Sequence, residues 1–189
     1  EVGLRAVPAT IANRIYQAGE NISSAAKAGD TKAIEKHLTE GADVNGRDPL
    51  DGTPLHWAAV QGHTNALKLL IEKGADVNAT DLVGQPPLLW ATFHGQYEAV
   101  ELLVKHGADV NPEINIGGKS ITALQVSRDE NFDAVEFIAK IHGAKPMRKE
   151  KFLEGRKKIT DLIIEHTSKD KGKGTSKSKK VKAPPAQKP

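Results

Sequence analysis

The sequence predicts an all-α repeat solenoid, in which pairs of short helices stack side by side. The pentapeptide GADVN occurs at residues 41–45, 74–78 and 107–111, each copy 33 residues after the last. Between the copies, apolar residues recur at helical spacing in two short runs separated by a glycine. A fixed period of this length is typical of stacked repeats. Helices of about ten residues are not stable alone, so each unit depends on burying its apolar face against the next.

The N-terminal part of the chain predicts a cap followed by an incomplete first unit. Residues 1–19 carry Ile11 and Ile15 at helical spacing, and we expect them to cover the first repeat. Residues 20–45 form that repeat, which lacks the opening of the pattern. The chain begins with Glu1 rather than Met, so we expect that it was processed or trimmed, and its start does not have the pattern of an intact signal peptide.

The second unit, residues 46–78, shows the helical pair most completely. Thr53 is the predicted N-cap and Pro54 the first helical residue, where its missing N–H costs nothing. Gly62 separates the two helices, and Gly74 ends the second as a left-handed C-cap. The predicted buried faces are Leu55, Ala58 and Ala59 in the first helix and Ala66, Leu67, Leu69, Leu70 and Ile71 in the second.

Two further units and a degenerate one follow. Residues 79–111 repeat the pattern, and residues 112–145 repeat it with three extra residues near 112–120. Residues 146–167 are interpreted as a degraded fifth repeat or C-terminal cap, with one helix around 148–154 and a second in GRKKITDLIIEHTSK. In that second helix Gly155, Leu162, Ile163 and His166 take the places of Gly95, Leu102, Leu103 and His106. Arg148 and Lys151 would give the polar outer face that a terminal cap needs.

Charge divides the chain into an acidic body and a basic end. Residues 1–144 carry 12 basic and 19 acidic side chains, whereas residues 168–189 carry eight Lys and one Asp. The absence of cysteine excludes disulfides, Cys-ligated metal sites and a Cys nucleophile. No apolar run approaches the roughly 20 residues that span a bilayer.

The second unit resembles an ankyrin repeat, since TPLHWAAVQGHTNALKLLIEKGADVN at residues 53–78 nearly completes that family's pattern. The resemblance covers roughly residues 20–145. It implies an L-shaped stack of helix pairs with β-hairpin-like fingers between units. It also implies a bond between Thr53 and His56 across the first turn. Pro86 and Leu89 replace both residues in the third unit, and Thr122 and Gln125 form a capping box in the fourth, so we interpret His56 as structural.

The sequence shows no catalytic constellation, and we expect neither an enzyme nor a cofactor. GKGT at residues 172–175 lacks the spacing of a phosphate-binding loop. No Ser or Thr is paired with a His and an acid in a recognisable arrangement. His106, His142 and His166 end equivalent helices, but the first two units have Glu40 and Lys73 there. We therefore interpret them as favourable helix C-terminal residues, not as a metal site.

The resemblance implies that partners bind the concave helix face and the finger tips. Trp57 and Trp90 share one position of the first helix in adjacent units, with Val60 and Phe93 three residues later. Stacking predicts a ridge of these four residues edged by Tyr97, with Val60 and Phe93 exposed. Exposed apolar groups of this size usually mark an interface. The alternative is that the two Trp side chains fill part of the core.

The predicted fingers supply the remaining candidate residues: Asp48, Leu50 and Asp51, then Asp81, Leu82 and Val83, then Ile114 and Ile116. The apolar members either tuck beneath their finger or contact a partner, because turns otherwise prefer polar residues. The acidic members would steer basic partners.

The sequence therefore predicts a non-catalytic protein-interaction module, monomeric or part of a larger assembly. The alternative is a subunit or adaptor held on nucleic acid, a ribosome or another anionic surface by its basic tail. Residues 168–189 cannot bury enough apolar surface to order themselves. Their Lys177, Lys179, Lys180 and Lys182 would contact phosphate, unless the tail only solubilises the chain or docks on the chain's own acidic body or on an acidic partner. We expect an intracellular protein in the cytoplasm, with the nucleus or an organelle as alternatives.

Overall fold

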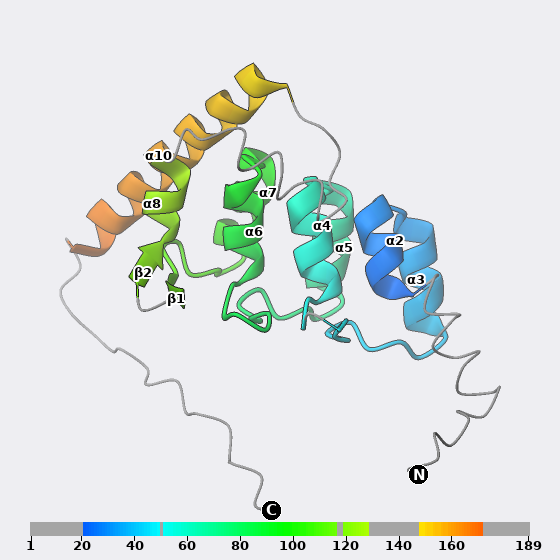
Figure 1. The fold of residues 1–189 in the computed structure, drawn as a ribbon. Helices are drawn as coiled ribbons and strands as arrows, with labels where there is room; N and C mark the ends of the chain where they lie inside the picture. The colour runs from blue at the N-terminus through cyan, green and yellow to red at the C-terminus, as the bar shows by residue number, and fades with distance from the viewer. Residues whose placement is uncertain (1–20, 50, 117–118, 129–147, 172–189) are drawn as a thin grey trace, which may run out of the picture.

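The computed structural model describes residues 21–49, 51–116, 119–128 and 148–171. Three helical pairs stack in sequence order, as Figure 1 shows. They are α2 (Ile22–Ala28) with α3 (Thr31–Thr39), α4 (Pro54–Gln61) with α5 (Thr64–Glu72), and α6 (Pro87–Phe93) with α7 (Tyr97–Lys105). A hairpin of β1 (Glu113–Ile116) and β2 (Lys119–Thr122) leads into α8 (Ala123–Arg128), and α10 (Lys149–Lys171) closes the described part.

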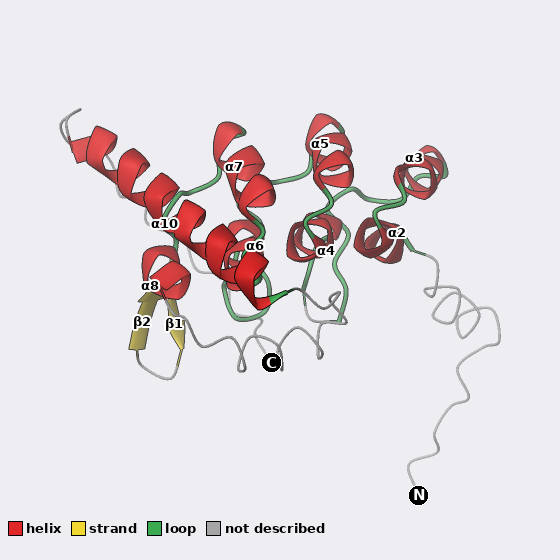
Figure 2. Cartoon of the chain, turned by 90° about the horizontal axis from the view of Figure 1, so that it is seen from above, coloured by secondary structure: helices red, strands yellow, loops and turns green. Residues whose placement is uncertain are grey.

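The helices lie in two rows, visible from above in Figure 2. The inner row is α2, α4, α6 and α8, and the outer row begins with α3, α5 and α7. Gly62 ends α4 with φ of 69°, and its equivalents Gly29 and Gly95 have φ of 75° and 64°. Because L-residues rarely adopt this conformation, a glycine at this point lets the chain turn at once from the inner to the outer row.

The recurrent GADVN segments join neighbouring units through their asparagine. The Asn45 side chain accepts from the backbone N–H of Asp76 at 2.9 Å, and Asn78 accepts from that of Asp109 at the same distance. Asn111 continues the series by accepting from the Leu124 N–H at 2.9 Å. Each asparagine thus satisfies backbone groups one unit further along, which gives a physical reason for its 33-residue recurrence.

The core runs through the stack as one continuous layer between the two rows. Its largest fully buried members are aliphatic: Ile34, Leu55, Leu67, Leu70, Leu88, Leu89, Leu103, Ile159 and Ile163. Burying such side chains is the main source of stability for helices this short.

The C-terminal region differs from its prediction. The prediction of two helices separated near Gly155 is wrong, because α10 runs unbroken through Gly155 from Lys149 to Lys171. The helix also continues past residue 168, where the tail was expected to begin. Gly155 lies against Gly95, so that a Cβ there would collide with the Gly95 carbonyl. The glycine is needed for close approach of two segments, not for a turn.

Helix α10 contacts α7 and α8 and runs obliquely to the two rows (Figure 2). The Arg156 guanidinium donates to the Phe93 carbonyl at 3.0 Å, in the way that the Gln96 amide donates to the Val60 carbonyl at 3.1 Å. Val60 and Phe93 are equivalent positions, so Arg156 repeats the role of Gln96. The outer helix predicted within residues 122–145 falls on 129–147 and lies outside the described residues, as do the predicted N-terminal cap and most of the tail.

Candidate functional site

Trp57 and Trp90 meet edge to face across neighbouring inner helices. Their ring centroids lie 5.3 Å apart with an interplanar angle of 89°. Trp90 is 4% exposed, whereas Trp57 is half-buried and carries the Lys27 ammonium 4.6 Å above its ring. The expectation that stacking brings the two Trp residues together is therefore met, but Trp90 belongs to the interior.

Each Trp indole is tied to an aspartate at the base of its finger. Trp57 Nε1 donates to Asp48 Oδ2 at 2.6 Å, and Trp90 Nε1 donates to Asp81 Oδ2 at 2.9 Å. The predicted ridge did not include this pairing, although an Asp nine residues before a Trp in two consecutive units was a visible signal. The two aspartates thus hold the fingers onto the inner helices.

The other oxygen of each aspartate closes the finger tip. Asp81 Oδ1 accepts from the Val83 and Gln85 N–H groups at 3.0 and 2.8 Å, and Asp48 Oδ1 accepts from the Gly52 N–H at 2.9 Å. Carboxylates that accept several N–H groups fix a turn firmly. Asp48 and Asp81 therefore have a structural role in addition to the predicted steering of basic partners.

The third finger presents two apolar side chains to solvent. Leu82 is 69% exposed and Val83 is 55% exposed. In the second finger Asp51 has a φ of 59° at the place where the third finger has Gly84. Asp51 and Gly84 therefore adopt the same left-handed backbone conformation at equivalent places of the two fingers.

Arg47 links the two fingers. Its Nη1 donates to the Thr80 carbonyl at 2.7 Å and to the Asp51 carbonyl at 3.0 Å. A guanidinium held by carbonyls on two neighbouring fingers fixes their relative position.

Other members of the predicted ridge are less accessible than expected. Val60 was predicted to be exposed, and this is wrong: it is fully buried, because the start of α7 covers the end of α4. Phe93 is half-buried and packs against the core. Tyr97 does not edge the Trp pair but begins the outer helix α7.

In the fourth finger Ile114 is 3% exposed, so it tucks beneath the hairpin, where it pairs with Ile121. The backbone of Ile116 pairs with Lys119. Leu50 lies outside the described residues. Of the apolar finger candidates whose side chains are described, only Leu82 and Val83 are exposed.

The His56 side chain is a buried structural link, as the sequence suggested. It is fully buried, and its Nδ1 lies 3.1 Å from the Thr53 N–H and 2.9 Å from Thr53 Oγ1. Its Nε2 lies 2.9 Å from the Gln85 carbonyl. Burial lowers the pKa of His56, against the smaller opposing effect of the Gln85 bond. In the third unit Leu89 fills the same place and is also buried.

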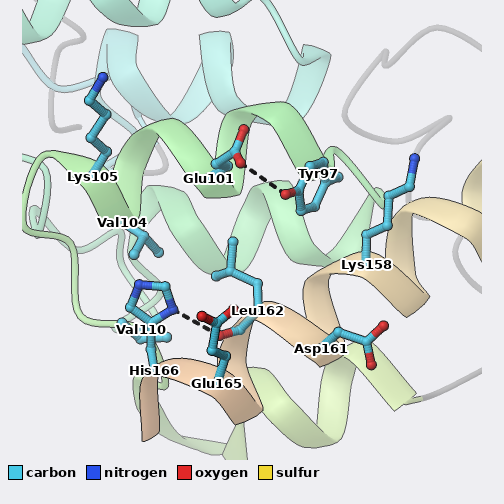
Figure 3. Close-up of a pocket in the computed structure, with 10 residues that line it drawn as sticks. All are labelled: Tyr97, Glu101, Val104, Lys105, Val110, Lys158, Asp161, Leu162, Glu165 and His166. Carbon is cyan, nitrogen blue, oxygen red and sulfur yellow. Dashed lines mark hydrogen bonds between the residues drawn. The ribbon is translucent and has the colours of Figure 1, made fainter. Parts of the chain in front are cut away.

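A groove of about 590 Å³ separates α7 from α10, and Figure 3 shows its lining. The Tyr97 hydroxyl donates to Glu101 at 2.9 Å, and this bond raises the pKa of Tyr97. The Lys158 ammonium lies 5.8 Å from the Tyr97 ring centroid and 2.6 Å from a Glu154 oxygen. The groove mixes both signs of charge along its walls, and no single ligand chemistry follows from it.

The part of the chain that the structure describes contains no cluster of His, Asp or Glu arranged to hold a metal ion. His166 contacts the Leu162 carbonyl at 2.9 Å, and His106 is exposed; His142 is not among the described residues. No described helix is long and apolar enough to cross a membrane.

The comparison with known families identifies the repeats. The family model for ankyrin repeats (three copies) matches residues 22–114. The chain contains ankyrin repeats. The predicted all-α repeat solenoid and its resemblance are thereby confirmed, and the match ends in the fourth finger. No curated protein matches the chain. Ankyrin repeats are generally protein–protein interaction modules and are typically non-catalytic, and no catalytic family matches this chain.

Proposed function

We propose that this ankyrin-repeat protein binds a partner protein through the edge formed by its second and third fingers. Leu82 and Val83 supply the apolar contact. The observation that carries the proposal is their exposure, 69% and 55%, on a turn that Asp81 and Trp90 hold in place. A rigid tip loses little conformational entropy on binding, so its apolar surface contributes efficiently to affinity.

The face made by the inner helices mainly stabilises the stack that carries the fingers, and contributes little surface for a partner. Val60 and Trp90 are buried, and Phe93 is half-buried in the core, so they hold the stack together. Trp57 remains half-buried under Lys27. Of the original ridge, we propose only Trp57 as a partner contact, at the margin of the surface.

The charge on the fingers favours a partner segment that carries Lys or Arg beside apolar residues. Asp51 adds negative charge to the second finger beside Arg47, and Asp81 is the charged residue of the third finger's turn. Complementary charge of this kind mainly raises the association rate and sets specificity. Burial of Leu82 and Val83 would supply the affinity.

A photo-crosslinking amino acid at position 82 tests the proposal, with the same probe at position 164 as a matched control. Ile164 is 39% exposed on α10, away from the fingers, and serves as the apolar reference. We expect a partner to be captured from position 82 only. The affinity of this chain for the purified partner should fall at least about tenfold in Leu82→Ser/Val83→Ser and should not fall in Ile164→Ser. Equal capture from both positions, or unchanged affinity of the double variant, refutes the proposal.

A second candidate function rests on the charge asymmetry of the chain. Residues 168–189 carry eight Lys and one Asp, and Lys177, Lys179, Lys180 and Lys182 among them lie outside the described residues. We propose attraction to an anionic surface such as nucleic acid as an alternative anchor. Binding through this tail should weaken steeply with salt and disappear when residues 172–189 are deleted, whereas finger binding should survive both. The compartment remains a prediction.

A further inference from the structure

Asn45, Asn78 and Asn111 end the three GADVN segments and make equivalent side-chain bonds. Each side-chain oxygen accepts a backbone N–H at 2.9 Å from one unit further along. The residues that follow them differ, and are Gly46, Ala79 and Pro112 in turn. Asn45 and its successor form the only Asn-Gly pair in the sequence. The three asparagines are therefore alike in structure but unlike in the backbone nitrogen next to them.

That nitrogen decides whether an asparagine side chain can react with its own backbone. After losing its proton, the nitrogen attacks the side-chain carbonyl carbon, Cγ, and forms a new N–Cγ bond. A five-membered succinimide ring closes, and the side-chain nitrogen leaves as ammonia. Water then opens the ring at either carbonyl–nitrogen bond, which gives aspartate or the β-linked isoaspartate. Water is the only other reactant, so the reaction is spontaneous and makes asparagine a labile residue.

The chain offers this reaction its best nucleophile at Gly46. A glycine nitrogen is approached most easily, because no Cβ crowds it and its backbone is the least restricted. The Ala79 methyl group hinders the same approach, and Pro112 has no N–H to lose. Asn45 and Gly46 are also half-buried, in a turn outside the helices and strands, whereas Ala79 is only 7% exposed. Asn45 is thus favoured both by its neighbour and by its access to water.

The folded chain opposes ring closure at Asn45 with a few hydrogen bonds. Asn45 Oδ1 accepts from the Asp76 N–H at 2.9 Å, and Asn45 Nδ2 donates to the Gly74 carbonyl at 3.4 Å. The Gly46 N–H donates to the Asp43 carbonyl at 2.9 Å. The Nδ2 bond is long for an N–H···O bond, and the equivalent bond one unit later is 3.2 Å. Because no helix or strand has to open, a local fluctuation of the turn frees the amide.

We propose that Asn45 is a site of spontaneous deamidation in the native protein, and that the reaction loosens the join between the α2–α3 pair and the α4–α5 pair. The amide NH₂ that donates to the Gly74 carbonyl is lost, and a carboxylate oxygen takes its place. The new charge lies beside Asp43, whose Oδ1 accepts from the Asn45 N–H at 2.9 Å. Isoaspartate also adds one carbon to the main chain. The modified fraction grows with the age of the protein, and the inference does not depend on the finger surface.

Peptide mapping by mass spectrometry on the purified full chain, sampled over weeks, tests the reaction. The mass gain of an amide turned into an acid should appear at Asn45 at least about tenfold faster than at Asn78, because only Asn45 precedes a glycine. Fragmentation that separates α-linked from β-linked aspartate should find both products. Equal rates at the two asparagines, or conversion of Asn45 only in urea-unfolded chain, overturns the proposal.

Two matched variants exchange the neighbours of these asparagines. Gly46→Ala should slow the reaction at Asn45 by at least about tenfold, and Ala79→Gly should start it at Asn78. The second variant adds no atoms, whereas a Cβ at Gly46 would lie 3.0 Å from the Asp43 carbonyl oxygen. If neither variant changes its site, the following residue does not control the reaction, and the proposal is wrong.

Hydrogen exchange tests the effect on the stack. The aged protein carries an extra negative charge, so anion-exchange chromatography separates it from the unmodified chain. This fraction and the variant Asn45→Asp should exchange at least about threefold faster across residues 22–39, because a bond between the units is lost. Asn65→Asp adds the same charge at an exposed position of α5 and should leave that exchange unchanged. Wild-type exchange in the aged fraction would show that deamidation does not loosen the join.

Discussion

The bond between Trp90 and Asp81 offers a sharp test of how the fingers are held. Asp81→Asn keeps one oxygen, which continues to accept from Val83 and Gln85. The new NH₂ group then faces the Trp90 N–H, so a donor replaces an acceptor. The substitution therefore removes one hydrogen bond and leaves the turn itself in place.

The size of the effect follows from burial. Trp90 is 4% exposed, so its N–H finds no water to replace the lost carboxylate. An unsatisfied buried donor costs about 1–3 kcal/mol. For a urea m-value of about 2 kcal/mol/M, a loss of about 2 kcal/mol lowers the unfolding midpoint by about 1 M. The matched control Asp76→Asn changes an exposed turn carboxylate, and its effect should stay within about 0.5 kcal/mol.

Urea unfolding followed by Trp fluorescence measures the free energies, and a double-mutant cycle isolates the bond. Trp90→Phe removes the donor, so Asp81→Asn should cost much less in that background. A coupling energy of about 1 kcal/mol or more is expected for a buried bond to a carboxylate. If Asp81→Asn is neutral, or if its cost is the same with Phe at position 90, the aspartate does not hold the finger through Trp90.

The remaining predictions concern the rest of the scaffold. The lowered pKa of His56 means that the unfolded state binds the proton more readily, so stability should fall as pH drops below about 6.5, and urea midpoints from pH 8 to 5 should fall less in His56→Gln. Gly155→Ala should destabilise by about 1–3 kcal/mol through its clash with Gly95, measured by thermal unfolding, while Glu154→Ala next to it stays near wild type. Arg47→Ala should speed amide exchange in the second and third finger tips without altering exchange in the core helices, since it removes one bond within the second finger and one bond to the third.

The repeat architecture could be predicted because its signals are local. Thr53, Pro54 and Gly62 fix the ends of α4 through backbone preferences, and the structure has α4 between them. The 33-residue period then makes Trp57 and Trp90 neighbours without further information. The backbone preferences at helix ends, together with the 33-residue repeat, are enough to predict this part of the fold.

The exposure of individual side chains could not be predicted in the same way. Val60 is buried because Gln96, 36 residues later, packs over its backbone, and the pattern of one helix does not contain that contact. The place of α10 depends on Arg156 and on the glycine pair Gly95 and Gly155, which are 60 residues apart. Such contacts depend on tertiary packing, which the alignment of the repeats with one another does not specify.

The double use of Asp48 and Asp81 limits how the finger edge can vary. Each carboxylate accepts a Trp N–H and at least one backbone N–H, so its charge cannot be removed without loosening the finger. Asp51 has no such constraint on its charge, because its carbonyl and not its carboxylate binds Arg47. The Leu82 side chain is 69% exposed, so it contributes little to the packing of the finger. Partner preference can therefore change at the tip residues while the aspartates and tryptophans behind them stay fixed, which separates the residues that build the surface from those that select what binds to it.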